Sequence, residues 1–159
     1  MHSHTPHARA IIVGTLFLIG AFAVGFLVMN IVGKSAVFED SSALERINVA
    51  GAPVTVFVAD TAEKQVRGLS GVAELPPNHG MLFVFEKDDF YTIWMKDMQF
   101  AIDVLWMEES GTIIHIEESL TPSTYPRTFT SEKPARFILE LPAGFVREHA
   151  LSAGSIVTI

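Results

Sequence analysis

This 159-residue sequence contains no cysteine, only two tryptophans and two tyrosines, and fewer basic than acidic residues. Without cysteine, an exported domain must rely on its core rather than on disulfide bonds. Ten of the 11 lysines and arginines follow residue 9, where they stand against 18 aspartates and glutamates. Because nucleic-acid binding requires a basic face, this composition predicts no nucleic-acid partner. The sequence also has no internal repeat or low-complexity tract, which favours a single globular domain.

One long run, residues 10–32, carries no charged side chain. At about 1.5 Å per residue, a helix of this length measures roughly 35 Å and crosses the ~30 Å hydrocarbon core of a bilayer. Because lipid offers the backbone no hydrogen-bond partners, such a run forms a helix in the membrane. The sequence therefore predicts a single transmembrane anchor here, with the lipid bilayer as its partner.

The orientation of this anchor is predicted from its weakly basic N-terminal flank. Arg9, the terminal amine and three histidines precede the run, whereas Lys34 is followed by Glu39 and Asp40. This asymmetry favours a cytoplasmic tail of residues 1–9 and a periplasmic C-terminal domain at a bacterial inner membrane. A cleaved signal peptide is the alternative, but the run exceeds the usual signal core and no clean A-x-A site follows it.

Small residues within the anchor form a candidate surface for packing against another membrane helix. Ala21 and Gly25 stand four positions apart, as in the small-xxx-small pairs that allow two backbones to approach closely, and Gly14 is a further candidate. Such a surface would serve contact with other integral membrane subunits. The simpler alternative is that glycine and alanine are common in membrane helices.

Residues 33–45 show no strand periodicity and are interpreted as a linker, which leaves one domain over residues 46–159. Short β-branched or apolar runs dominate this domain. They predict strands at 54–58, 81–85, 91–95, 101–106, 112–116, 136–141 and 155–159. A Thr/Ser/Pro-rich segment, 121–134, is predicted to be a surface loop that covers one end of the fold or contacts a partner.

Two segments have helical features. Thr61 is a candidate N-cap, Glu63 falls in the first turn, and Gly68 or Gly71 ends the helix; a second helix is expected over 144–151. Since strands outnumber helices, the predicted fold is α+β but mostly β. It is a small antiparallel barrel or curved sheet with two short helices, preceded by the transmembrane helix. Closure of the sheet would remove exposed strand edges.

Charged residues that interrupt apolar stretches mark a candidate ligand site, comprising Arg67, Trp94, Lys96, Asp97 and Asp103. Asp103 lies inside an apolar strand, where a buried carboxylate needs a partner such as Arg67 or Lys96. Together these side chains can line a polar cleft, with Trp94 as a wall for a sugar-like or other small ligand. The alternative is a buried ion-pair network that sets strand register, with Trp94 in the core.

Several short motifs together resemble one protein family. In chain order they are Glu63…Arg67-Gly68-Leu69, Gly80-Met81-Leu82-Phe83-x-Phe85, Trp94-Met95-Lys96, Asp103, Gly111-x-Ile113, Leu139-Glu140-Leu141 and Ala143-Gly144. This set is similar to the uncharacterised bacterial and archaeal family called domain of unknown function 192, over roughly residues 53–159. The resemblance implies a compact β-rich domain, often exported or anchored by one N-terminal hydrophobic segment. It implies no established reaction.

Three positions depart from the family pattern. Ser70 stands where methionine is usual, Val72 lies near a position that is often basic, and Asp97 replaces asparagine. If the family shares a basic pocket, this chain has lost one positive charge and gained one negative charge. The departures therefore weaken any anion-binding role.

Catalytic and metal sites have little support in the sequence. His115 and Glu117 share one face of a strand, but they would need His149 or His79 to approach the ligand number of a zinc site. Ser70 lacks the Gly-x-Ser-x-Gly pattern of hydrolases. We therefore predict no catalytic residue, no metal site and no cofactor.

Three functions remain open at this point. The leading hypothesis is a membrane-anchored, non-catalytic domain that acts as an interaction or accessory subunit of a larger membrane protein assembly. The alternative is an extracytoplasmic module that binds a small, carbohydrate-like ligand through the candidate site. A hydrolase or metal enzyme has the least support.

Overall fold

The computed structural model describes residues 44–159, which form nine β-strands, two short α-helices and one 3-10 helix. In chain order the elements are β1 (Leu44–Val49), β2 (Ala52–Ala59), α2 (Ala62–Arg67), β3 (His79–Asp89), β4 (Thr92–Trp94), β5 (Ile102–Met107), β6 (Ile113–Leu120), η2 (Pro122–Thr124), β7 (Thr128–Thr130), β8 (Ala135–Pro142), α3 (Phe145–Glu148) and β9 (Val157–Thr158). The predicted tail, the anchor at 10–32 with Gly14, Ala21 and Gly25, and most of the linker lie outside the described residues. Among residues 44–159, no helix has both the length and the apolar character needed to cross a bilayer.

Seven strands form one mixed sheet in the order β6-β5-β8-β3-β2-β1-β9, and β4 pairs with β7 in a separate two-stranded sheet. Most neighbouring strands are antiparallel, as predicted, but β2 and β3 run parallel. This pair is the exception within a sheet that is mostly antiparallel. The connection over 60–78 includes α2, and its length allows the crossover that parallel strands require.

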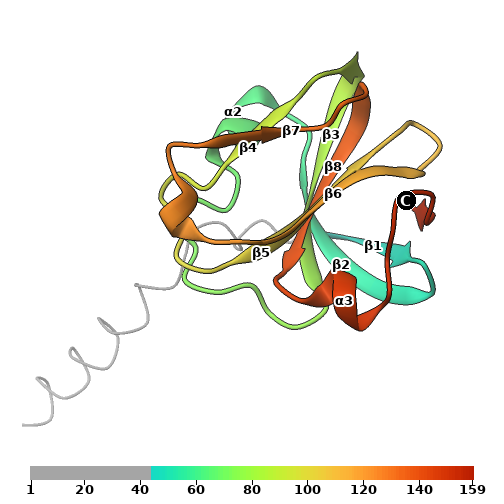
Figure 1. The fold of residues 1–159 in the computed structure, drawn as a ribbon, viewed down its shortest axis with the longest axis horizontal. Coiled ribbons are helices and arrows are strands. Elements are labelled where there is room, and N and C mark those ends of the chain that lie inside the picture. The colour runs from blue at the N-terminus through green and yellow to red at the C-terminus, as the bar shows by residue number, and fades with distance from the viewer. Residues whose placement is uncertain (1–43) are drawn as a thin grey trace, which may run out of the picture. The chain divides into compact units, whose positions relative to one another are not determined.

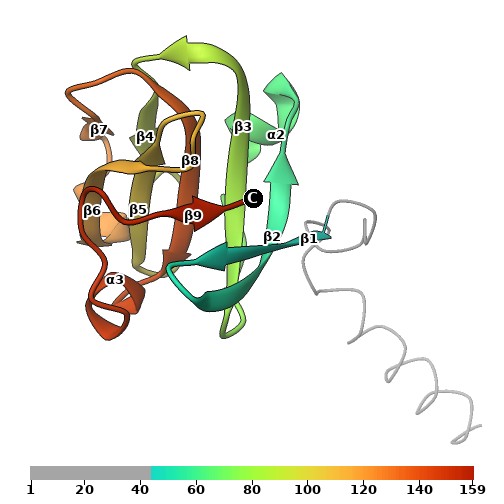
Figure 2. The same cartoon turned by 90° about the vertical axis from the view of Figure 1, so that its right-hand side faces the viewer.

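The large sheet curls until its two ends approach each other. Figure 2 shows β1 and β9 crossing in front of β3, β8 and β5. Thr112 forms an isolated bridge with Ile156, and the Val157 amide donates to the Gly111 carbonyl over 2.9 Å. A side chain at Gly111 would overlap the Val157 carbonyl oxygen, so this closure requires glycine. The fold is thus a mostly-β, curled half-barrel with two short helices, in agreement with the coarse prediction.

The central strands β3, β8 and β5 are buried on both faces, which divides the core into two clusters. The two-stranded sheet β4–β7 lies over one face, and β1, β9 and α3 lie over the other (Figure 1). The apolar side chains of each face form one cluster with residues of the elements that cover it. Because successive strand residues point to opposite faces, Met81 and Phe83 join the first cluster and Leu82 joins the second. Burial on both faces therefore explains the continuous apolar run at 81–85.

Each strand predicted from the sequence overlaps an observed strand, whereas β1 and β7 were not predicted. In β1 only Ile47 and Val49 are buried, and in β7 only Phe129 is buried. Such sparse apolar patterns leave little periodicity to detect. β1 begins at Leu44, inside the range expected to be a linker, and the predicted loop at 121–134 contains η2 and β7.

Both predicted helices are present. The Thr61 hydroxyl caps α2 by accepting a hydrogen bond from the Lys64 amide over 3.3 Å, and Gly68 ends the helix. α3 covers only four residues of the predicted 144–151 segment. α2 contains no buried residue, so its position depends on caps and on side-chain hydrogen bonds to the strands.

Candidate functional site

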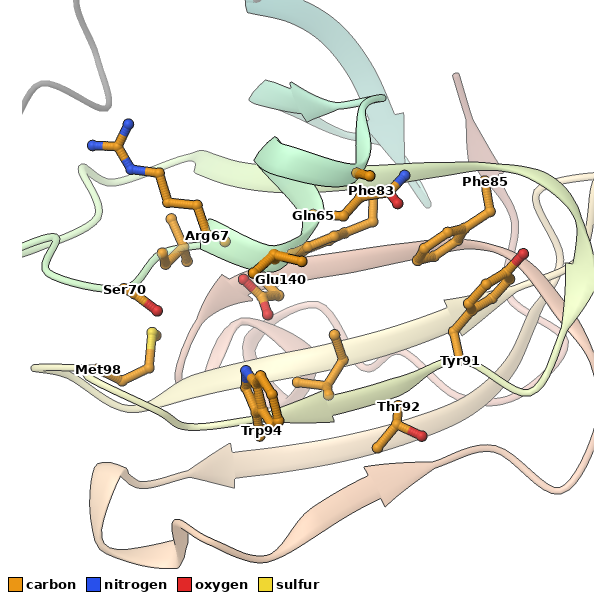
Figure 3. A pocket seen from close by; sticks show the side chains of 15 residues that line it. Gln65, Arg67, Ser70, Phe83, Phe85, Tyr91, Thr92, Trp94, Met98 and Glu140 are labelled. Carbon is orange, nitrogen blue, oxygen red and sulfur yellow. The ribbon is translucent and has the colours of Figure 1, made fainter.

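A cavity of about 270 Å³ lies on the face of the sheet that β4 and β7 cover. Its walls come from α2, the loop that follows α2, β3, β4 and one residue of β8 (Figure 3). This volume falls just below the range of roughly 300–1,000 Å³ typical of pockets for drug-sized ligands. The pocket is therefore suited to a compact small molecule.

Hydrogen bonds hold the α2 side of the pocket in place. The Gln65 amide nitrogen donates to the carbonyls of Ala59 and Val84, over 3.3 and 2.8 Å, and so joins α2 to β2 and β3. The Ser70 hydroxyl donates to the Lys96 carbonyl over 2.9 Å, which joins the loop after α2 to the segment after β4. The polar protons of Gln65 and Ser70 are thus already engaged within the protein.

Aromatic side chains form much of the remaining wall. The rings of Phe85 and Tyr91 stack with centroids 3.5 Å apart, and Phe83 lies next to Phe85 at 6.4 Å. Partial burial raises the pKa of Tyr91, and the charge of Asp89 adds to this shift. Trp94 lines the pocket at its open edge and remains 48% exposed. An exposed tryptophan face at a pocket edge can receive the apolar side of a ligand.

Glu140 is the one β8 residue that lines the pocket. Its backbone lies between Met81 of β3 and Val104 of β5, whose side chains belong to the apolar cluster on the same face. The residue is 5% exposed, and within residues 44–159 its Oε2 atom has no hydrogen-bond partner. Burial raises the pKa of the Glu140 carboxyl from 4.5 to about 8, since desolvation disfavours the charged form. The carboxyl group is therefore mostly neutral at pH 7.

The structure brings together only two of the five predicted site residues. Arg67 and Trp94 line the pocket, although Figure 3 shows the Arg67 guanidinium directed away from Glu140 and Trp94. Lys96 and Asp97 are exposed and are absent from the pocket lining. Their backbone carbonyls accept hydrogen bonds from the loop after α2. These two residues therefore support the pocket wall through their backbones, and their side chains do not line the pocket.

Backbone geometry accounts for the residue type at position 97. Asp97 has a φ of 55°, in the left-handed region that asparagine, aspartate and glycine tolerate best. The exchange of asparagine for aspartate at this turn is therefore compatible with the local backbone. Because the Asp97 side chain does not line the pocket, the exchange does not alter the charge of its lining.

Asp103 is fully buried, but it lies on the opposite face of β5 from the pocket, because Ile102 and Val104 face the pocket-side cluster. The prediction that Arg67 or Lys96 would pair with the Asp103 carboxylate is wrong. Asp103 Oδ1 accepts from the Ser119 amide over 2.8 Å, and Oδ2 accepts from the amides of Gly144 and Val146 over 3.0 and 2.9 Å. These bonds satisfy the carboxylate, cap the start of α3 and attach it to the sheet.

Glu140 is the site residue that the sequence interpretation missed, although it stood within the quoted motif Leu139-Glu140-Leu141. The detectable signal was an acidic residue inside an apolar strand, the same signal that selected Asp103. Alternation places Glu140 on the same face as Ile138, which is fully buried. Pocket residues Gln65, Phe85 and Tyr91 carry no comparable signal.

The residues considered for metal binding do not gather. Within residues 44–159, no group of three or more histidine, aspartate or glutamate side chains is arranged to hold a metal ion. His115 and Glu117 do lie together on one strand face, with Nε2 and Oε1 3.3 Å apart. The described part of the chain thus supplies only this pair.

A protein-family model described as an uncharacterised ACR matches residues 45–159, nearly all of the described domain. The chain belongs to the DUF192 family. Two similar relatives are UPF0127 proteins of Thermococcus kodakarensis and Thermococcus gammatolerans, 31% and 29% identical over 105 residues. The match covers 65% of this chain, and 63% and 65% of the two relatives, so it spans slightly less than two thirds of their length.

Two solved structures share the fold with this DUF192 domain. A Sinorhizobium meliloti protein, assigned provisionally as a transcription regulator, is 30% identical and covers 70% of this chain and 88% of its own, with a TM-score of 0.66. A Novosphingobium aromaticivorans protein of unknown function is 22% identical and covers 78% and 91%, with a TM-score of 0.70. The second likeness concerns the fold alone.

Proposed function

We propose that this DUF192 domain is a small-ligand binding module, and that residues 10–32 hold it beside the bacterial inner membrane on the periplasmic side. The observation that carries the proposal is the buried Glu140 carboxyl, whose Oε2 lacks a hydrogen-bond partner within residues 44–159 while the side chain points into a pocket. Buried polar atoms without a hydrogen-bond partner are rare in folded proteins, and each one calls for an explanation, such as a catalytic role or a bound water or ion. Trp94 supports the same interpretation, because a large exposed aromatic ring forms the opposite wall.

The proposal replaces most of the predicted ligand site. Arg67 and Trp94 remain, Glu140 is added, and Lys96, Asp97 and Asp103 are removed because their side chains do not line the pocket. The pocket combines a largely apolar lining with a few polar groups, which is the usual composition of small-molecule sites.

Tryptophan fluorescence of the full-length chain tests this proposal. The chain has two tryptophans, of which Trp94 is 48% exposed and Trp106 is fully buried. A panel of small neutral, anionic and cationic compounds should contain at least one that shifts Trp94 emission and raises the unfolding temperature. The substitution Trp94→Phe should remove the emission change, whereas Asp97→Asn, outside the pocket, should preserve it. Failure of every class to bind would contradict the proposal.

A second candidate function is an accessory subunit of a membrane assembly. Val66 and Trp94 at the pocket edge are 74% and 48% exposed, and such apolar groups favour contact with a partner protein. Sizing of the gently solubilised native protein tests this proposal, since migration only as a free monomer would contradict it. The charge balance does not favour a nucleic-acid partner, so the regulatory assignment of the Sinorhizobium neighbour is not extended to this chain.

A further inference from the structure

We infer that the pocket selects a small organic cation, an alkylammonium group that pairs with the Glu140 carboxylate and lies against the Trp94 ring. This inference rests on the proposed function, because it assigns a chemical class to the ligand of the same pocket.

Within residues 44–159, no positively charged side chain forms an ion pair with Glu140. Its strand neighbours on the same face are Met81 and Val104, both in the apolar cluster. Among the described residues that line the pocket, the ionisable side chains are Arg67 on α2, Tyr91 before β4 and Glu140 itself. The Arg67 guanidinium points away from the carboxyl group (Figure 3). A bound cation would therefore supply the positive partner that the Glu140 carboxylate lacks.

The opposite wall suits a cation as well. Figure 3 places Trp94 across the pocket from Glu140, with the two side chains directed toward each other. The stacked pair Phe85 and Tyr91 closes one side. Tryptophan is the strongest of the aromatic partners for a cation, and the attraction increases when both groups are desolvated. Aromatic faces form the known cages that bind quaternary ammonium groups, and Glu140 adds a carboxyl group to the aromatic wall of this pocket.

Anionic and neutral ligands fit this lining less well. An anion would meet the Glu140 carboxyl group, and the cationic side chain among the described lining residues, Arg67, is directed away from it. A sugar requires several hydrogen-bond donors and acceptors, but the amide protons of Gln65 and the hydroxyl proton of Ser70 are already donated to backbone carbonyls. A compact cation needs only one charged partner and apolar contact, which is what the pocket offers.

Cation binding must displace a proton from Glu140. With burial raising its pKa to about 8, the Glu140 carboxyl group is mostly protonated at pH 7 before a cation binds. When the ammonium ion enters, the Glu140 O–H bond breaks, its electron pair stays on the carboxylate, and the proton passes to the solvent. Ligand affinity should therefore rise about tenfold for each pH unit up to about pH 8 and level off above it.

The test uses the full-length chain in a nonionic polyoxyethylene detergent, with choline as the cationic probe. Its neutral isostere, 3,3-dimethylbutan-1-ol, has the same shape without the charge. Calorimetry should show choline binding at least ten times tighter than the isostere at pH 8. A pH-indicator titration at pH 7 should detect close to one proton released for each choline bound. The effect of pH on choline affinity provides an independent measurement on the unaltered protein.

Two matched substitutions locate the effect. Glu140→Gln should weaken choline binding at least tenfold and abolish proton release, whereas Glu132→Gln, the same change at an exposed loop position, should alter neither. Choline binding without proton release, or equal binding of the isostere, would overturn the inference. If neutral or anionic compounds bind at Trp94 while choline does not, the cation inference fails and the binding function stands. If no class binds, both proposals fail.

Discussion

Asp103 and Glu140 are two buried carboxyl groups on neighbouring strands, and they face opposite sides of the same sheet. Their backbones are almost adjacent, since Asp103 pairs with Leu141 and Val104 pairs with Glu140. Asp103 accepts three backbone hydrogen bonds, from the amides of Ser119, Gly144 and Val146. Glu140 leaves Oε2 without a partner within residues 44–159 and points into a pocket. Both carboxyl groups are thus buried, but only that of Asp103 has its hydrogen bonds satisfied by the described part of the protein.

This difference distinguishes Asp103, whose carboxylate is fully used within the protein, from Glu140, whose carboxyl group is free to bind a ligand. A buried polar group that is fully hydrogen-bonded stabilises the arrangement around it, as Asp103 does for the start of α3. A buried group without a partner lowers stability, so its presence indicates another role. The face that carries α3 therefore contributes to stability, and the face with Trp94 is the one that we propose for ligand binding.

The largest expected effect is the loss of the Asp103 hydrogen bonds. Asp103→Ala leaves three backbone amides without their acceptor, that of the buried Val146 among them, and should cost roughly 5 kcal/mol of unfolding free energy or prevent folding. Asp103→Asn keeps one acceptor oxygen and should cost less. Urea unfolding of the full-length chain measures both variants. Asp97→Asn, the same change at an exposed position, should stay within about 0.5 kcal/mol; a similar loss at both sites would contradict the structural role of Asp103.

The next effect is a pH dependence of stability caused by Glu140. Because its folded pKa of about 8 exceeds the unfolded value of 4.5, the folded state holds a proton that the unfolded state has released. The contribution of Glu140 is therefore most favourable below pH 4.5 and declines by about 1.4 kcal/mol per pH unit until about pH 8. Between pH 4.5 and 7 the decline amounts to about 3 kcal/mol.

Comparison of Glu140→Gln with the unaltered chain isolates this contribution. Denaturant unfolding at several pH values should show that the substitution removes the decline attributed to Glu140. Glu132→Gln should retain the profile of the unaltered chain. Parallel pH profiles for the unaltered chain and Glu140→Gln would show that the Glu140 carboxyl is not buried in the way described.

The two tryptophans give a smaller contrast between the core and the pocket edge. Trp106 is fully buried and its indole nitrogen donates to the Tyr91 carbonyl over 3.1 Å, so Trp106→Phe should cost roughly 2 kcal/mol. Trp94→Phe should cost under about 0.5 kcal/mol, because Trp94 is 48% exposed. Acrylamide should quench the emission of Trp94 much more than that of Trp106. Equal quenching in the two single-tryptophan variants would place Trp94 in the core instead.

Much of the fold could be predicted because most of its elements carry local signals. The apolar run at 81–85 and the capped helix after Thr61 are both visible without any tertiary information. β7 could not be predicted in the same way, since Phe129 is its one buried residue and the strand forms only by pairing with β4. The parallel pairing of β2 with β3 likewise depends on the path of the intervening chain.

The candidate site was predictable only in part. Arg67 and Trp94 stand out by residue type and do line the pocket, but Lys96 and Asp97 were grouped with them by sequence proximity. Position along a turn does not determine which side chains converge. The turn at Asp97, with its positive φ, directs this part of the chain through backbone hydrogen bonds to the loop after α2.

By itself, the sequence determined a mostly-β domain of the DUF192 family and singled out Asp103 as an acidic residue inside an apolar strand. The same signal is present at Glu140, where the sequence interpretation missed it. The alternation of side chains along each strand also determined which residues of that strand share a face of the sheet. Only the tertiary structure decided which carboxyl would find hydrogen-bond donors. Those donors are the backbone amides of Ser119, Gly144 and Val146. Because nearly every residue carries a backbone amide, the sequence does not show which amides will meet a given carboxylate. The path of the folded chain brings three of them to Asp103 and none to Glu140 Oε2 within residues 44–159.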